Sequence, residues 1–289
     1  MSRRHPLYLV DAFTREPFHG NPAAVCLLRH DCPDSTLQAI AAEMNLSETA
    51  FPRPVGDDLF EAHEFHLRWF TPTVEVALCG HATLATAKIL FDELGLAAER
   101  LTFHTQSGPL HASARGGGRI RLDFPANPPE PFAAAPEVGR ALGAPASLQA
   151  YRAPSNGVVM VRLPAEADVR ALRPDFPRLL AACPSAPVVI ATAPGSDRHD
   201  FVSRVFAPAS GINEDPVTGM AHTTLGPYWG KELGRRQLTG YQASARGGEV
   251  EIDLTPDGRV GMTGSSRIML RGYLDVPEPR AAGPPGPTA

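Results

Sequence analysis

The chain has 289 residues, 43% of them hydrophobic and 20% charged, a composition typical of a globular protein with one large domain or two modest ones. Its formal net charge is −4, and it has no basic stripe with interleaved aromatic residues, which argues against nucleic acid as a partner. No apolar run approaches the roughly 20 residues that span a bilayer, so we expect no membrane partner.

The cysteines and the first residues bear on the cellular compartment. The four cysteines are scattered and show no CxxC spacing, which argues against a zinc site or a disulfide framework. Residues 1–15 do not resemble a signal peptide, because Asp11, Thr14 and Arg15 interrupt the apolar stretch. We therefore expect a cytoplasmic protein without a bound metal.

The first elements in chain order are two strands, a short helix and a third strand. Alternating apolar residues predict strands at residues 7–13, 23–28 and 63–70. A helix is predicted at residues 36–44, with Ser35 as its N-terminal cap.

The strongest helix prediction covers residues 81–94. Apolar side chains recur there at spacings of three and four, and Gly95 follows as a glycine that ends a helix. A matching segment at residues 220–233 ends at Gly234. Three short strands are expected after the first helix, at residues 101–106, 109–114 and 119–124. One apolar helix among many short strands predicts a curved, mainly antiparallel sheet wrapped around a central helix.

A proline-rich junction at residues 125–131 is expected to be a stiff linker. It divides the chain into an N-terminal lobe, residues 1–126, and a C-terminal lobe, residues 127–276. The last segment, residues 277–289, is rich in proline, glycine and alanine and is predicted to be a disordered tail.

The two lobes repeat one another. Five short segments recur in the second half in the same order, at offsets of 135 to 140 residues. The matched positions are Asn21 with Asn156, Phe70 with Phe206, Gly80 with Gly219, Leu94 with Leu233 and Arg119 with Arg259. A period this long is that of a duplicated domain rather than a solenoid.

Each lobe carries a small-residue turn that opens its central helix, at Gly80 and at Gly219. Duplicated halves usually enclose a ligand between them. The free N–H groups and the dipole of a helix start favour an anion, so two such starts facing one cleft would clamp a small carboxylate. The alternative is that both glycines merely allow close packing of helix on sheet.

Several segments of this sequence resemble the PhzF-like family of phenazine biosynthesis. The resembling segments are residues 10–13, 18–25, 45–51, 68–72, 79–85 and 214–219. The resemblance covers the chain to about Tyr273. It implies an α+β fold of two pseudo-symmetric diaminopimelate epimerase-like lobes, each a curved, mostly antiparallel sheet wrapped around a central helix. It further implies a homodimer and an isomerase that works without a cofactor.

Glu48 is the candidate proton shuttle. Its apolar neighbours Leu46, Ala50 and Phe51 should desolvate the carboxyl group in part and raise its pKa. The resemblance implies that Glu48 takes a proton from one carbon atom and returns it to another. The alternative is a surface glutamate at a strand edge. The repeat offset points to residues 183–185 as its counterpart, where no acid occurs.

His81 and Asp215 are the other catalytic candidates, because the resemblance places both in the cleft with Glu48. His81 begins a helix, where the dipole disfavours a charged imidazole. Asp215 precedes the second helix and could instead cap it. Asn21 and Ser47 are candidates for positioning the substrate.

Gly219 and Met220 complete the expected substrate contacts, together with Gly80. The family commonly has a small hydroxyl residue where this chain has Met220. We therefore expect a substrate other than that of the phenazine enzyme. His19 and His222 lie near these motifs and could as easily be structural.

Two other functions remain open on the same fold. A two-thiol racemase or epimerase would use Cys79, but the equivalent second-half residue is Thr218, and one thiol cannot supply that mechanism in its usual form. A small-molecule binding protein without catalysis could retain the same cleft.

Overall fold

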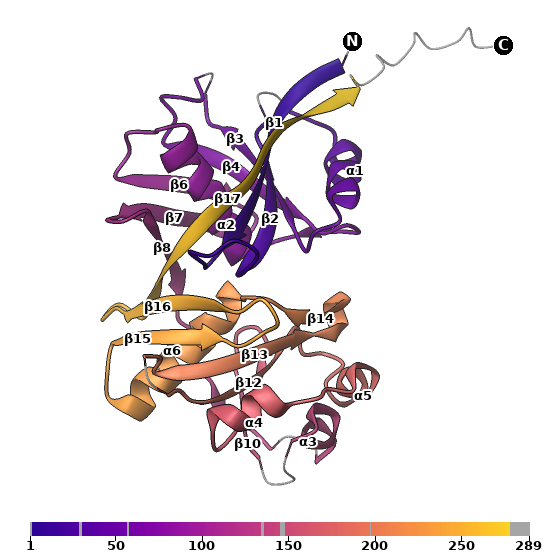
Figure 1. Ribbon diagram of the computed structural model, residues 1–289, viewed down its shortest axis with the longest axis vertical. Coiled ribbons are helices and arrows are strands. Elements are labelled where there is room, and N and C mark those ends of the chain that lie inside the picture. The colour runs from indigo at the N-terminus through magenta and orange to yellow at the C-terminus, as the bar shows by residue number, and fades with distance from the viewer. Residues whose placement is uncertain are drawn as a thin grey trace, which may run out of the picture.

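The computed structural model describes residues 2–28, 31–56, 58–133, 136–144, 148–196 and 198–277. Two similar units are stacked along the long axis (Figure 1). In each unit a curved sheet surrounds one helix, α2 (Gly80–Lys88) in the first and α6 (Gly219–Leu233) in the second. This confirms the predicted fold class. The predicted disordered tail lies outside the described residues except for the backbone of its first residue.

The first unit is built from eight strands and two helical segments besides α2. Its strands are β1 (Ser2–Ala12), β2 (Asn21–Cys26), β3 (Thr49–Pro54), β4 (Glu64–Phe70), β5 (Glu75–Val76), β6 (Arg100–Thr105), β7 (Gly108–Arg115) and β8 (Arg119–Pro125). Its other helical segments are α1 (Asp34–Met44) and the π-helix η1 (Ile89–Glu93).

The second unit repeats this order. Its strands are β9 (Glu130–Pro131), β10 (Gln149–Arg152), β11 (Val159–Arg162), β12 (Val189–Pro194), β13 (Phe201–Ala207), β14 (Ile212–Asp215), β15 (Gln237–Gln242), β16 (Gly248–Leu254) and β17 (Arg259–Pro277). Its helices besides α6 are α3 (Pro136–Leu142), α4 (Glu166–Ala171), α5 (Phe176–Ala182) and the short 3-10 helix η2 (Pro208–Ser210).

Strand pairing shows the duplication directly. In the first unit β2 pairs with β3 in parallel, β3 with β4 antiparallel and β4 with β6 in parallel. In the second unit β11 and β12, β12 and β13, and β13 and β15 pair in the same three senses. The predicted repeat is therefore a repeat of topology.

The same pairing corrects the expected counterpart of Glu48. Thr49 begins the parallel pairing of β3, and Val189 begins that of β12. The counterpart of Glu48 is therefore the buried Val188, and the expectation of residues 183–185 was wrong. The offset grows here because two short helices, α4 and α5, occupy the connection that α1 fills in the first unit. The second unit still offers no acid at this place.

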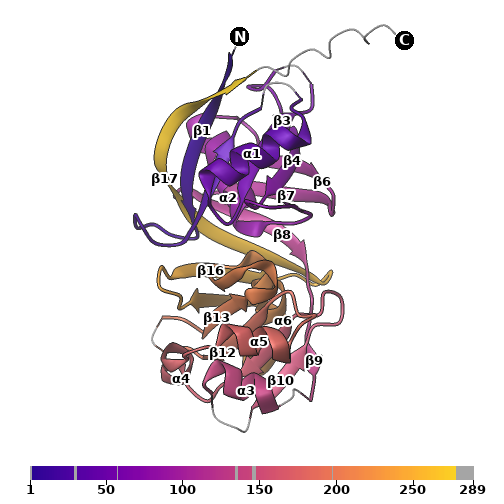
Figure 2. The same ribbon diagram turned by 90° about the vertical axis from the view of Figure 1, so that its right-hand side faces the viewer.

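The long strand β17 joins the two units. Its first part pairs with β16 and β8, and its remaining part runs along β1 (Figures 1 and 2). The junction at residues 125–131 packs against the second unit, because Asn127 is buried and its N–H donates to the Thr223 carbonyl at 3.0 Å. The division of the chain between residues 126 and 127 stays a prediction.

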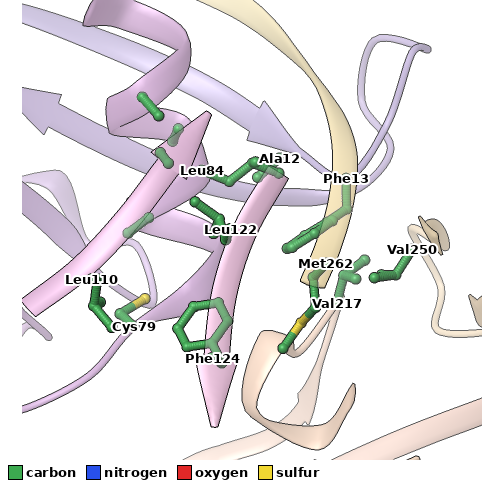
Figure 3. Close-up of a cluster of buried hydrophobic side chains, with 14 of the residues drawn as sticks. Ala12, Phe13, Cys79, Leu84, Leu110, Leu122, Phe124, Val217, Val250 and Met262 are labelled. Carbon is green, nitrogen blue, oxygen red and sulfur yellow. The ribbon is translucent and has the colours of Figure 1, made fainter. Parts of the chain in front are cut away.

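One hydrophobic core runs through both units where they meet. Figure 3 shows side chains of the two units gathered there, among them Phe13, Leu84 and Phe124 with Val217, Val250 and Met262. Burial of each such side chain stabilises the folded state by roughly 1.5–3 kcal/mol. The shared core therefore holds α2 and α6 in a fixed relation to each other.

Several predicted boundaries differ from the structure. The helix predicted at residues 81–94 changes to a π-helix after Lys88, although Gly95 has the expected left-handed conformation (φ 66°). Ser35 is not a cap, because α1 begins at Asp34 behind Pro33 without a side-chain hydrogen bond. The strand β3 was not predicted. Among the described residues, no helix is long and apolar enough to cross a membrane.

Candidate active site

The two central helices begin against each other. A Cβ atom placed on Gly80 would lie 3.1 Å from the Cα atom of Gly219, and one on Gly219 would lie 3.1 Å from that of Gly80. Only residues without a side chain permit this approach. Neither helix start is capped by a side chain, so N–H groups of both first turns remain for a ligand. The two glycines meet as the sequence repeat predicts.

Beside the contact of Gly80 with Gly219, on the side of the first unit, lies one cluster of polar side chains: Glu48, His81, Cys79 and Ser47. The Oε2 atom of Glu48 lies 3.3 Å from Nε2 of His81, though not in hydrogen-bond geometry. The Sγ atom of Cys79 lies 3.5 Å from Nδ1 of His81, and the Ser47 hydroxyl lies 3.4 Å from Nε2. Which ring nitrogen carries the proton is set by these contacts.

Burial governs the protonation of this cluster. Desolvation raises the pKa of Glu48. Hydrogen bonds from Ser47 and Cys79 lower this pKa, but desolvation is the larger effect and the pKa is raised. Desolvation lowers the pKa of His81 and raises the pKa of the Cys79 thiol well above its usual value, with the Glu48 charge adding to the latter. At neutral pH the cluster therefore holds a neutral imidazole, a protonated thiol and a carboxyl group that can gain and lose a proton.

Asp215 stands on the second unit's side. It is buried at the end of β14 and accepts hydrogen bonds from the Asn21 amide (2.8 Å to Oδ1) and from the Thr218 hydroxyl (to Oδ2). Desolvation raises its pKa, while electrostatic interaction with His81 lowers it, so the two halves of the site are coupled through His81. No hydrogen bond from the α6 backbone to Asp215 is seen, which corrects the alternative that it caps that helix.

Gln242 completes this network and was missed from the sequence. Its amide Nε2 donates to the Asp215 carbonyl at 2.7 Å, and its Oε1 accepts from the Thr218 N–H at 2.9 Å. Gln242 is fully buried at an inward position of β15. A glutamine inside an alternating strand is the only signal in the sequence, and it does not tell a site residue from a structural one.

Met220, His222 and His19 make no hydrogen bond or ion pair with Glu48, His81 or Asp215. Met220, on the first turn of α6, packs partly buried against the core. His222 is buried, and its Nδ1 lies 2.8 Å from the Thr218 carbonyl oxygen. Burial lowers the pKa of His222 to about 4, so it is a neutral, structural residue. His19 is exposed; its Nδ1 lies 3.0 Å from the Pro17 carbonyl oxygen, and its own carbonyl accepts a hydrogen bond from Arg246.

The site is almost closed. The side chains of Glu48 and His81 are 13% and 6% exposed, so Glu48 is the more accessible of the two. A cavity of about 290 Å³ lies elsewhere between the units and is bordered by Arg15, Arg198 and Tyr241. None of the three catalytic candidates lines it. We therefore identify the candidate site by its reactive side chains and not by the size of a cavity.

The cluster also contains three donor groups that suit a metal ion. Among the described residues, ligand atoms of Glu48, Cys79 and His81 all lie within 4.8 Å of one another. Residue spacing does not indicate this set, because Glu48 comes from a segment far along the chain from Cys79 and His81. That the chain needs no metal stays a prediction.

Comparisons with known proteins show the family to which the chain belongs. A family model described as phenazine biosynthesis-like protein (PhzC-PhzF) matches residues 10–272. An uncharacterized isomerase of Pseudomonas aeruginosa is 46% identical over 270 residues, which cover 93% of this chain and 98% of the relative. Phenazine biosynthesis-like domain-containing protein 2 of Mus musculus is 43% identical over 284 residues, with the same shares covered.

Solved structures give the same result for the fold. A PhzF-family protein of Enterococcus faecalis is 43% identical, with a TM-score of 0.86 over 95% of this chain and 99% of that one. A hydroxyproline epimerase from Agrobacterium vitis has a TM-score of 0.57 at 11% identity, a likeness of fold alone.

Proposed function

Because the chain belongs to the phenazine biosynthesis-like (PhzC-PhzF) family, we propose that it is an isomerase that moves a proton between two carbon atoms of a small carboxylic acid. Glu48 is the acid and base of this reaction, and no cofactor takes part. The observation that carries the proposal is the position of Glu48. Its buried Oε2 has no hydrogen-bond partner and lies beside a neutral histidine where two helix starts meet.

The substrate carboxylate binds at the helix starts. The uncapped starts of α2 and α6 meet at Gly80 and Gly219, and both helix dipoles favour negative charge there. Carboxylate binding at Gly80 and Gly219 sets the acidic carbon atom of the substrate beside Glu48. Asn21 positions Asp215, to which it donates a hydrogen bond, and Ser47 positions His81, with which it is in contact.

The proton transfer has two steps. The Glu48 carboxylate removes a proton from one carbon atom, and the electron pair left behind is delocalised into the conjugated acid. The Glu48 carboxylic acid then returns the proton to a second carbon atom, which restores the carboxylate. A raised pKa suits both steps, because it brings the carboxyl group closer to the pH at which it must work in either direction.

His81 and Asp215 support this chemistry. The neutral imidazole of His81 can donate or accept a hydrogen bond without adding a charge, and it lies 3.3 Å from Glu48. Asp215 is held by Asn21 and Thr218 on the opposite side. Since these groups are nearly closed off, we expect the structure around Glu48 to open locally when substrate enters.

Further parts of the proposal follow from the family resemblance and from the composition of the chain. The protein is a homodimer in the cytoplasm, and neither nucleic acid nor a membrane is its partner. Met220 replaces the small hydroxyl residue common at this place, so the substrate differs from that of the phenazine enzyme.

A thiol-based racemase is the second candidate. The contact of Cys79 with His81 favours it, because a histidine can take the thiol proton. Against it stands Thr218, the residue that replaces the second thiol, whose hydroxyl is engaged with Asp215. Burial also keeps Cys79 protonated.

The test is substrate-dependent uptake of deuterium from heavy water, screened over amino acids and cyclic dienoic acids. The proposal predicts that at least one acid gains deuterium at carbon only when the enzyme is present. Acids that bind saturably without exchange, across the whole screen, would show a binding protein instead.

A further inference from the structure

We propose that Glu48, Cys79 and His81 form a binding site for a zinc ion and that zinc held there blocks the enzyme. The binding stands on the donor geometry alone. Only the block of activity rests on the function proposed above, because it requires Glu48 to be the proton shuttle.

The three donors are a thiolate sulfur, an imidazole nitrogen and a carboxylate oxygen, the set that zinc prefers. Around a tetrahedral zinc ion, bonds of 2.0–2.3 Å place such donors roughly 3.3 to 3.6 Å apart. The Oε2 atom of Glu48 is 3.3 Å from Nε2 of His81, and Sγ of Cys79 is 4.0 Å from the same nitrogen. All three donor atoms lie within 4.8 Å of one another, so the thiol must move closer to Nε2 of His81 to complete the coordination.

A second observation points to a ligand at this place. The Oε2 atom of Glu48 is buried but has no hydrogen-bond partner. A buried carboxylate oxygen without a partner costs free energy that a bound cation would recover. This unpartnered Oε2 atom is also the Glu48 atom that lies 3.3 Å from Nε2 of His81. The missing hydrogen bond and the cluster of donor atoms are therefore at the same place.

Zinc bound here acts as an inhibitor. The carboxylate oxygen that coordinates zinc can no longer carry a proton. Three protein ligands leave one position for water, but no other carboxylate or imidazole of the cluster remains to act as base. Binding also displaces the thiol proton, so zinc affinity should rise with pH.

The test measures zinc binding to the chelator-treated full chain by competition with a chromophoric chelator, and uses cobalt(II) as a spectroscopic probe. We expect one zinc ion per chain and a sulfur-to-cobalt charge-transfer band. Changing a residue that merely orients a ligand costs about 10- to 100-fold in metal affinity, so Cys79→Ser should cost at least about 100-fold and abolish the band. Cys32→Ser, which removes a thiol outside the cluster, should change neither.

Two further variants guard against misfolding. Glu48→Gln and His81→Gln should each weaken zinc binding while thermal melts show that the variants fold. Zinc binding that survives Cys79→Ser, or that disappears in Cys32→Ser, would overturn the site. Absence of stoichiometric binding in the unchanged protein would do the same.

Activity is read separately by the deuterium exchange. We expect stoichiometric zinc to stop the exchange and a chelator to restore it. Exchange that continues with zinc on the three residues would overturn the role of Glu48 and leave the metal site standing. Failure of zinc to bind, with Glu48→Gln inactive, would overturn the metal site and leave the proposed function standing.

Discussion

A methyl group added at Gly80 should damage catalysis far more than it damages the fold. In Gly80→Ala the new Cβ atom lies 3.1 Å from the Cα atom of Gly219, where ordinary carbon contacts are about 3.5–4.0 Å. The two helix starts must therefore separate by a few tenths of an ångström. Overpacking of this kind costs about 1–3 kcal/mol, from which the higher helix propensity of alanine recovers up to about 1 kcal/mol.

The net loss of stability should be about 1–2 kcal/mol. In a chain of this size each kcal/mol lowers the melting temperature by about 2–4 °C. Catalysis should suffer more, because misplacing reactive groups by about 1 Å can cost roughly 100-fold in rate. The displacement falls between the carboxylate-binding helix starts, so both the substrate and Glu48 lose their alignment.

The assay pairs a thermal melt with deuterium exchange on the same preparation. Gly116→Ala is the matched control, because a Cβ atom there meets nothing within 4 Å and the residue does not have a positive φ. We expect that control to match the unchanged protein in both measurements. Gly80→Ala with unchanged stability and unchanged exchange would refute the argument that the two helix starts must touch.

Three other residues give predictions of their own. The pKa of His222 is about 4 in the folded state but about 6.5 in the unfolded state, so the unfolded chain takes up a proton first as the pH falls. The free energy of unfolding, measured by urea denaturation, should therefore fall by about 3 kcal/mol between pH 6.5 and pH 4. In His222→Asn the fall should be smaller. Arg246→Ala leaves the buried Asp11 carboxylate, 2.7 Å from the guanidinium, without its partner and should cost about 3 kcal/mol in the same assay. Asn21→Ala removes the amide that donates to Asp215 and should lower stability by about 1–3 kcal/mol in thermal melts.

An exposed residue supplies the control for Arg246→Ala. Arg271→Ala breaks an exposed ion pair with Glu93 and should cost much less stability than Arg246→Ala. Equal losses of stability in Arg246→Ala and Arg271→Ala would contradict the buried contact between Arg246 and Asp11. Stability that does not change between pH 6.5 and pH 4 would contradict the account of His222.

The duplication could be predicted because its signals are local. A glycine that starts or ends a helix and the alternation within a strand depend on a few adjacent residues, so Gly80, Gly95, Gly219 and Gly234 marked both central helices. The meeting of Gly80 with Gly219 then followed from the pseudo-symmetry of the repeat.

What could not be predicted depends on packing between distant segments. The counterpart of Glu48 was misplaced because the connection before β12 is longer, and only strand register shows that. The π-helix after α2 has no local signature. Gln242 joins the site through hydrogen bonds to residues 24 to 27 positions away, which spacing along the chain does not encode.

The central claim, that Glu48 carries the proton, is tested most directly by comparing two variants in one exchange assay. Glu48→Gln keeps the size of the side chain but cannot carry the proton, and Cys79→Ser removes the neighbouring thiol. The account predicts that Glu48→Gln loses at least about 10⁴-fold in exchange rate, the upper end for a general acid or base, while Cys79→Ser retains most of its activity. An inactive Cys79→Ser beside an active Glu48→Gln would contradict it and establish a thiol-based epimerase in its place.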